Sequence, residues 1–474
     1  MKADQVRPEL APPNGTALLC RNLARTTFSD LSDENVSLFR DRLLDMAGCI
    51  FGGAAVAEDR FFYALLKRQG GTEEAPLFTD AARLPLTSAV LGNCVLARAN
   101  DFGSMYTEIF GEGIASHFSE TMIPMGLTLG DAFGVSGEAL VVNNIAAEDL
   151  TARILYTLPV RWPTDMQLVS TAAAAVAARY YGLDAEQCRT ALSFAAANST
   201  TPGNAYYDYS QEFKLHNGES ARIGVLSARI AKEGAWRGFA DPYFGHWGLI
   251  SSKLPEGELP ELYEKAFSDL GARYYTETRF KKGPGGIPTT AAGDCGRRLH
   301  WRLEEKYGAF DPESIRAVHV WRTGNMRRNY YDEPFVLRDH TNALFSYRFA
   351  ACCALLLGER RVDAVQTEAI RKNRRLLELA ENATMDVFDS PDGEQWLRVS
   401  VETADGGTLT ETVNYAAAMR EYPTREFLRA KFWSQFRAFG KLPNSVGEEI
   451  IRLSERIEAL ADVREFTSLL TLPR

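Results

Sequence analysis

The stretch MQLVSTAAAAVAARYY, residues 166–181, decides the fold class of this chain because it is nearly all apolar. A helix that is apolar on every side normally lies at the centre of a protein. Gly182 ends this helix as a C-terminal cap. Asp184 begins the next helix, over residues 185–198, with Gln187 placed as in a capping box. The stretch therefore predicts a buried central helix in a compact multi-helix core.

Helical patterns extend on both sides of this centre. Ser32 begins a helix whose apolar residues recur at three-to-four spacing as far as Ile50, and Gly52 and Gly53 are expected to end it. Further helices are expected over residues 88–97, 125–133, 146–155 and 220–234. The proline-containing first 30 residues lack an apolar signal core and are expected to form a loose tail.

The pattern changes after about Gly271. Residues 315–322 are β-branched and aromatic, and Leu397, Val399 and Val401 alternate with polar residues as in a half-buried strand. A tight-turn sequence at 404–407 leads into a partner strand over 408–413. Helices are expected over 343–357 and 365–381, and helical character resumes at Thr424.

This order predicts a mainly α fold with an inserted α+β lid. The expected parts are an N-terminal tail (1–30), a large helical domain (31–272), a smaller α/β lid domain (273–415) and the C-terminal return of the helical domain (416–474).

The composition excludes several classes of protein. The chain has 474 residues, of which 45% are hydrophobic and 24% charged, as in an ordinary globular protein. Its net charge of -9 argues against non-specific nucleic-acid binding, and no apolar run approaches the ~20 residues that span a bilayer. An odd count of seven cysteines without a Cys-x-x-Cys motif indicates reduced thiols and a cytoplasmic location. Six scattered histidines give no support for a metal site.

Asp101 and His117 are the first candidates for chemistry. They lie between an apolar helix and an apolar run over 122–133, and three glycines separate them, which favours a loop. Reactive side chains are often placed on loops held by rigid neighbours. The alternative is an exposed loop in which Asp101 caps a helix and His117 makes a structural hydrogen bond.

A second candidate is the basic, glycine-rich turn over residues 279–288, ahead of a helix. Lys281 and Lys282 supply positive charge, and glycines such as Gly285 can leave backbone N–H groups free to face an anion. The alternative is a basic surface turn.

Residues 206–218 form a third candidate, in which Lys214 or His216 can face a cleft beside Tyr207. The alternative is that the tyrosines pack and that Lys214 is solvated.

These segments together resemble the MmgE/PrpD family over most of the chain, from about Ser32 to Leu470. The resemblance rests on the order and spacing of short matches, which are Arg42–Gly48, Asp101–Phe102, His117–Ser119 followed by Pro124, Ala147–Ile154, Pro163–Thr164, Tyr181–Asp184, Lys214–Ala221, Phe280–Lys281 with Pro284, Phe345–Ser346, Ala354–Gly358, Lys431–Phe432 and Asp462–Val463.

The resemblance implies a helical domain interrupted by a smaller α/β lid, usually as a homodimer, with no required cofactor. Such proteins include dehydratases, decarboxylases and epimerases. Their active site lies between the domains and handles small di- or tricarboxylates through a proton abstracted next to a carboxylate.

The chain departs from the family pattern at several polar positions. The family usually shows His-x-Leu-Asp-Phe-Asp-Asp, whereas residues 98–104 read RANDFGS, so of the three aspartates only the first is kept, as Asp101. Met105 stands where the family has Thr, and Trp162 stands where it has His. Lys281 matches without a shift, whereas Lys214 is displaced by one residue. The replacements make the pocket more apolar and imply a less highly charged substrate.

The leading hypothesis is a cofactor-independent lyase or isomerase that acts on a small carboxylate or enolisable carbonyl compound. Asp101 or His117 moves the proton, and Lys281 stabilises the negative charge that develops. The predicted substrate contacts are Lys214, His216, Tyr207, Trp162, Met105, Lys282 and Gly285. The alternatives are an isomerase or cyclase of a specialised metabolite and a non-catalytic binding protein. The expected partners are a small carboxylate and a second copy of the chain.

Overall fold

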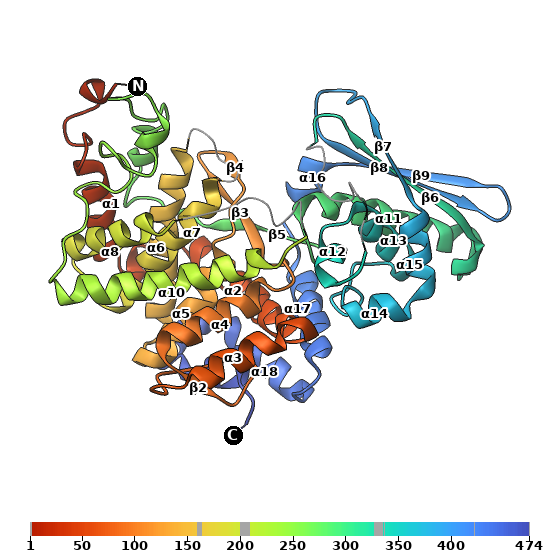
Figure 1. Ribbon diagram of the computed structural model, residues 1–474, viewed down its shortest axis with the longest axis horizontal. Coiled ribbons are helices and arrows are strands. Elements are labelled where there is room, and N and C mark those ends of the chain that lie inside the picture. The colour runs from red at the N-terminus through yellow and green to blue at the C-terminus, as the bar shows by residue number, and fades with distance from the viewer. Residues whose placement is uncertain are drawn as a thin grey trace.

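The computed structural model describes residues 2–158, 164–199, 209–326, 335, 337–420 and 422–473. The chain forms a large helical part and a smaller α/β part, which lie side by side in Figure 1. The predicted fold class, mainly helical with a smaller α/β part, is confirmed. Among the described residues, no helix is both long and apolar enough to cross a membrane.

The large part is built around α7 (Val169–Tyr180), in which every side chain except that of Arg179 is buried. The expected central helix is therefore confirmed, as is the capping box at Asp184 that begins the next helix. The other principal helices of this part are α1 (Asn14–Arg25), α2 (Asp33–Ala54), α3 (Arg60–Gln69), α4 (Leu86–Arg98), α5 (Ser119–Phe133), α6 (Gly137–Tyr156), α8 (Ala185–Ala197), α10 (Glu212–Glu233), α17 (Arg425–Phe439), α18 (Asn444–Ser454) and α19 (Arg464–Thr467).

The expected loose tail over residues 1–30 is wrong from Asn14 onward. Helix α1 packs against α8, and its Leu19, Cys20 and Leu23 side chains are buried in the main apolar core. These three residues lie on one face of a helix, so burial of that face holds the segment in place.

Helix α2 does not stop at its two glycines, because it continues to Ala54. A Cβ atom at Gly53 would lie 1.9 Å from the carbonyl oxygen of Leu96. Gly53 therefore allows α2 and α4 to approach closely, which places the C-terminal end of α4 deep in the protein. Helix α17, from the end of the chain, packs on the same α2.

The smaller part is a four-stranded sheet with helices packed on it. The strand order is β7 (Thr384–Phe388), β6 (Ile315–Thr323), β8 (Trp396–Thr403) and β9 (Thr408–Asn414). Strands β6 and β7 are parallel, and the other two pairs are antiparallel. The predicted strands and the β8–β9 hairpin are therefore confirmed.

Two helices expected in the smaller part are each divided into two shorter helices. The helix expected over 343–357 is two helices, α12 (His340–Leu344) and α13 (Tyr347–Leu357), because Ser346 caps the second by accepting a hydrogen bond from the backbone N–H of Phe349. The helix expected over 365–381 is divided into α14 (Thr367–Lys372) and α15 (Arg374–Asn382). The remaining helices of this part are α11 (Ile287–Tyr307) and α16 (Tyr415–Arg420).

The segment between Asp101 and His117 is a β-hairpin, so the expected flexible loop is wrong. Strands β3 (Ser104–Ile109) and β4 (Glu112–Ile114) pair with each other, and β3 also pairs with β5 (Glu277–Phe280). Strand β5 was expected to belong to the α/β domain, but it completes a sheet of the large part. The smaller part therefore begins only after Lys281.

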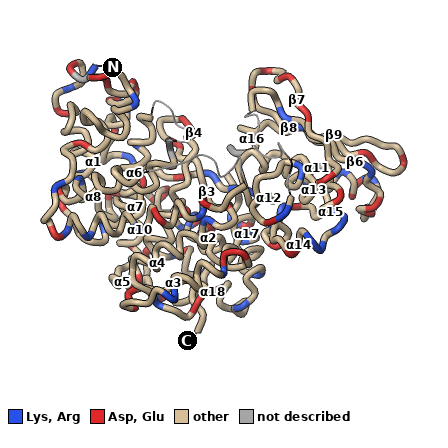
Figure 2. The backbone as a smooth tube through the Cα atoms, viewed as in Figure 1, with Lys and Arg blue, Asp and Glu red and all other residues tan. Residues whose placement is uncertain are grey.

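All seven cysteines are buried and none forms a disulfide. Figure 2 shows basic and acidic positions interspersed over both parts of the chain. The apolar helices around α7 bury their apolar faces within a single chain, so they give no reason of their own to expect a dimer. The homodimer implied by the resemblance stays a prediction.

Candidate active site

The hairpin and strand β5 bring three predicted residues together. Asp101 follows the last turn of α4 in a left-handed conformation (φ 45°), and its N–H donates to the Arg98 carbonyl at 2.9 Å. His117 lies two residues before α5. Ser104 is paired with Phe280, the last residue of β5. Lys281 follows directly and therefore lies beside Asp101.

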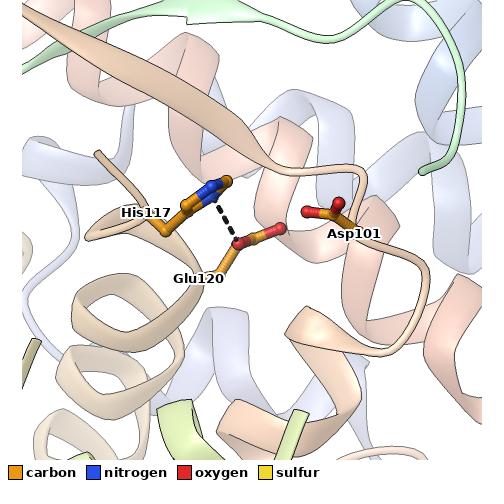
Figure 3. A group of neighbouring side chains, drawn as sticks. All are labelled: Asp101, His117 and Glu120. Atoms are coloured by element: carbon orange, nitrogen blue, oxygen red, sulfur yellow. Dashed lines mark ion pairs between the residues drawn. The ribbon is translucent and has the colours of Figure 1, made fainter. Parts of the chain in front are cut away.

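The side chains around Asp101 form one connected cluster. Lys281 Nζ donates to the Asp101 carbonyl at 2.8 Å and also to Asp101 Oδ1. Arg98 Nη1 donates to Asp101 Oδ1 and, at 2.5 Å, to Glu120 Oε2. His117 Nδ1 lies 3.3 Å from Arg98 Nη1 and 3.4 Å from Glu120 Oε2. Figure 3 shows the Asp101 and Glu120 carboxylates directed toward each other, with the His117 ring beside Glu120.

Burial gives this cluster its electrostatic character. None of the five residues is more than 4% exposed. Burial alone would raise the pKa of Asp101, but Arg98 and then Lys281 outweigh it and lower that pKa to about 2. Burial likewise opposes ionisation of Glu120, but Arg98 and His117 keep its pKa below the usual range. Both carboxylates are therefore ionised and balance the two cations.

His117 behaves differently from the two carboxylates. Burial lowers the pKa of His117, and the nearby charge of Arg98 lowers it further, although Glu120 acts in the opposite direction. The imidazole is therefore neutral at neutral pH, so one ring nitrogen can accept a proton. Burial also lowers the pKa of Lys281, with Asp101 and Glu120 opposing that shift.

Asp101, His117 and Glu120 have the residue types of a metal site, and their ligand atoms lie within 4.8 Å of one another. Arg98 Nη1, however, is in contact with the ligand atoms of all three residues. A metal ion placed among them would meet this guanidinium group and, at Asp101, the Lys281 ammonium group. The cluster therefore fits an anionic or neutral ligand better than a metal.

Arg98 and Glu120 were not among the predicted site residues. Arg98 is the one charged residue of a helix whose other residues are mostly apolar, and Glu120 lies in the first turn of another mostly apolar helix. A charged side chain in a helix that is apolar on all sides must be buried with a partner. Charged residues within mostly apolar helices could therefore have identified both Arg98 and Glu120 in the sequence.

Lys214 is buried, so the alternative of a solvated Lys214 is wrong. Its Nζ lies 2.9 and 3.1 Å from the two Asp59 carboxylate oxygens. His216, two residues further along α10, is partly exposed. Asn217 was not predicted, but its side-chain amide donates to Thr121 Oγ1 at 2.9 Å and to the His117 carbonyl at 3.4 Å. Helix α10 therefore reaches His117 through Asn217.

Gly285 does not offer its amide to an anion. Its N–H lies 3.0 Å from the Asn100 carbonyl and 3.2 Å from the Asp101 carbonyl. Gly285 has a φ of 105°, and a Cβ atom there would lie 2.0 Å from the Leu344 carbonyl oxygen. The glycine-rich turn therefore holds the Asp101 turn in place, and the expected free amide at Gly285 is wrong.

Lys282 differs from its neighbour Lys281 in burial. Its side chain is 21% exposed, lies 3.6 Å from Asp294, and lines a cavity of about 400 Å³ whose lining does not include Lys281.

Met105 is fully buried on β3, where it is paired with Arg279. Trp162 and Tyr207 lie outside the described residues.

Comparison with known proteins agrees with this architecture. A family model for the MmgE/PrpD N-terminal domain matches residues 18–259. The cis-aconitate decarboxylase of Mus musculus is 25% identical over 409 residues, which cover 82% of this chain and 80% of that protein. The cis-aconitate decarboxylase of Homo sapiens is 25% identical over 411 residues, with the same coverage of 82% and 80%. Since the family model spans half of the chain and both relatives extend the match well beyond it, this protein belongs to the MmgE/PrpD family.

Proposed function

We propose that this protein is a cofactor-independent lyase or isomerase that moves a proton next to the carboxylate of a small substrate. The observation that carries the proposal is a neutral, buried imidazole, His117, beside two buried cations, Arg98 and Lys281. A base placed next to cations can remove a proton while the cations stabilise the negative charge that develops. The two cis-aconitate decarboxylases support the lyase class.

His117 is the better candidate for the base. Arg98 and Lys281 hold Asp101 ionised with a pKa of about 2, so its carboxylate is a weak proton acceptor at neutral pH. Burial and the charge of Arg98 lower the pKa of His117 from its usual value, so the ring is neutral at neutral pH and can accept a proton at a ring nitrogen. Asp101 then orients Lys281, to which it is bound through both its carbonyl and its carboxylate.

The proposed chemistry uses these groups in two steps. His117 takes the proton, and the electrons of the broken C–H bond move onto the substrate carboxylate or carbonyl as an enolate. Lys281 and Arg98 stabilise that oxygen charge. Collapse of the enolate then expels a leaving group, which takes the proton held by His117, as in a lyase. In an isomerase, the carbon takes that proton back instead.

The charge balance of the cluster supports a substrate of low charge. Arg98 and Lys281 are already neutralised by Asp101 and Glu120. Each further carboxylate brought among these buried groups costs desolvation free energy that no remaining cation of the cluster offsets. A monocarboxylate therefore fits better than a tricarboxylate.

The test is proton exchange in D₂O. The protein would be incubated with 3-hydroxybutyrate, malate, citrate and cis-aconitate, which differ in the number of carboxylates, and the acids analysed by mass spectrometry. We expect deuterium next to a carboxylate, or elimination, with an acid of low charge. His117→Ala should abolish this exchange, and His319→Gln, in the sheet of the smaller part, should not. Unchanged exchange in His117→Ala would overturn the assignment of the base. Saturable binding without any exchange would instead favour a binding protein.

A further inference from the structure

Glu277 is a fully buried carboxylate behind the candidate active site. It is the first residue of β5, the strand that ends immediately before Lys281. Its Oε1 atom accepts hydrogen bonds from Ser116 Oγ and from the Phe118 N–H, both at 2.7 Å. Its Oε2 atom accepts a third from the Ser119 N–H at 3.0 Å. One side chain therefore satisfies three donors.

These donors lie on both sides of His117 in the sequence. Ser116 precedes His117, and Phe118 and Ser119 follow it at the start of α5. The two N–H groups belong to the helix N-terminus, where no intrahelical acceptor exists for them and where a negative charge is favourable. The Glu277 carboxylate therefore fixes the chain immediately before and after the imidazole.

The backbone of Glu277 is itself fixed by a hydrogen bond to a further buried residue. Its N–H donates to Glu148 Oε1 at 2.6 Å, and Glu148 Oε2 forms an ion pair with Arg42 Nη2 at 2.6 Å. Arg42 in turn donates to Ser119 Oγ at 2.7 and 3.0 Å. The buried chain Glu277–Glu148–Arg42 thus returns to the same helix start, which gives the His117 segment little freedom to shift.

We propose that Glu277 is a positioning residue that sets the place of the His117 imidazole, which rests on the proposed role of His117 in proton transfer. Only a carboxylate can serve all three donors, since an amide has a single acceptor oxygen. In Glu277→Gln at least one backbone N–H would face an NH₂ group. A displacement of about 1 Å in a reacting group can cost about 100-fold in rate.

The experiment compares Glu277→Gln with a matched control. Asp149→Asn removes another fully buried carboxylate, which accepts the Tyr275 N–H at 3.0 Å close to β5, and none of the hydrogen bonds described for Asp149 reaches residues 116–119. Both variants would be made with ¹⁵N-labelled histidine, and His117 would be assigned among the six histidines by loss of its signals in His117→Gln.

We expect Glu277→Gln to change the His117 ring signals and their titration, and Asp149→Asn to leave them as in the wild type. With an acid that the protein converts, Glu277→Gln should lower kcat by ~10- to 100-fold and change KM by less than ~3-fold. The conservative variant Glu277→Asp should give effects between those of the wild type and of Glu277→Gln. It replaces Glu277→Gln in the test if that variant does not fold.

Unchanged His117 signals in a folded Glu277→Gln or Glu277→Asp protein would overturn the proposal. Equal changes in Asp149→Asn would also overturn it, because they would show a general loosening of the fold. If no acid is turned over, the histidine signals still decide whether Glu277 positions His117, while the proposed function fails separately.

Discussion

Replacing Lys281 by Met should show how much more a fully buried lysine contributes than the partly exposed lysine next to it in the sequence. Methionine keeps most of the side-chain stem and deletes the ammonium group. Lys281 is fully buried and bound to Asp101, whereas Lys282 is 21% exposed and lies 3.6 Å from Asp294. Lys282→Met is therefore a matched control one residue away.

The structure sets the size of the expected difference. Two charges about 3 Å apart attract by about 5–6 kcal/mol at an effective dielectric constant of ~20, and removing one partner of a buried pair typically costs about 3–5 kcal/mol. Arg98 remains bound to Asp101 after the change, so we expect the lower end, about 3 kcal/mol. Lys282→Met should cost less, about 1 kcal/mol, because its ion pair with Asp294 is longer, at 3.6 Å, and its side chain is partly exposed.

Urea denaturation at pH 7, followed by circular dichroism, would measure both losses in the free energy of unfolding. The double variant Asp101→Asn/Lys281→Met should cost about 1–3 kcal/mol less than the sum of the single variants, because the second change removes the charge left unpaired by the first. With an acid that the protein converts, Lys281→Met should also weaken binding, turnover or both by about 2–5 kcal/mol. Equal losses in Lys281→Met and Lys282→Met, within about 0.5 kcal/mol, would refute this reasoning.

Four further outcomes are expected. His117→Ala and Asp101→Asn should each lower turnover at least ~100-fold with folding retained, and near-normal turnover in both would remove this turn from the mechanism. Because burial and Arg98 lower the pKa of His117 below 6.5, turnover that needs the neutral ring should persist below pH 6.5 and fall only as the pH drops through the lowered value; a pH–rate profile with its midpoint at or above 6.5 would contradict this. Burial raises the pKa of Glu148 from 4.5 to about 7, so the folded state keeps a proton that the unfolded chain releases. Stability should therefore decline by about 3 kcal/mol as the pH rises from about 4.5 to about 7, and denaturation of Glu148→Gln at several pH values should lack this slope. Light scattering at micromolar concentration should give the mass of a dimer, and a stable monomer would contradict that expectation.

Local sequence patterns predicted the helical core and the main sheet of the smaller part. The apolar run at 166–181 became the buried helix α7, and Asp184 caps α8 as expected. The alternation around Val399 and the turn at 404–407 became the β8–β9 hairpin. Periodicity, capping and turn chemistry depend on residues close in the sequence, so they can be read from the chain alone.

The sequence predicted part of the candidate active site but not its arrangement. Asp101, His117 and Lys281 were singled out, and the structure brings them together. Arg98 and Glu120, which complete the cluster, were missed. The three glycines between Asp101 and His117 were interpreted as a loop, although the hairpin there is held by its pairing with β5.

The sequence by itself therefore determined the family, the mainly helical fold and the candidate acid–base groups. Only the tertiary structure decided that Lys281 binds Asp101 from 180 positions away and that Glu277 holds the chain around His117 from about 160 positions away. The physical reason is that strand pairing and burial of charge depend on contacts between distant segments. A fully buried lysine and a partly exposed one have the same local sequence signature, and only the folded protein distinguishes Lys281 from Lys282.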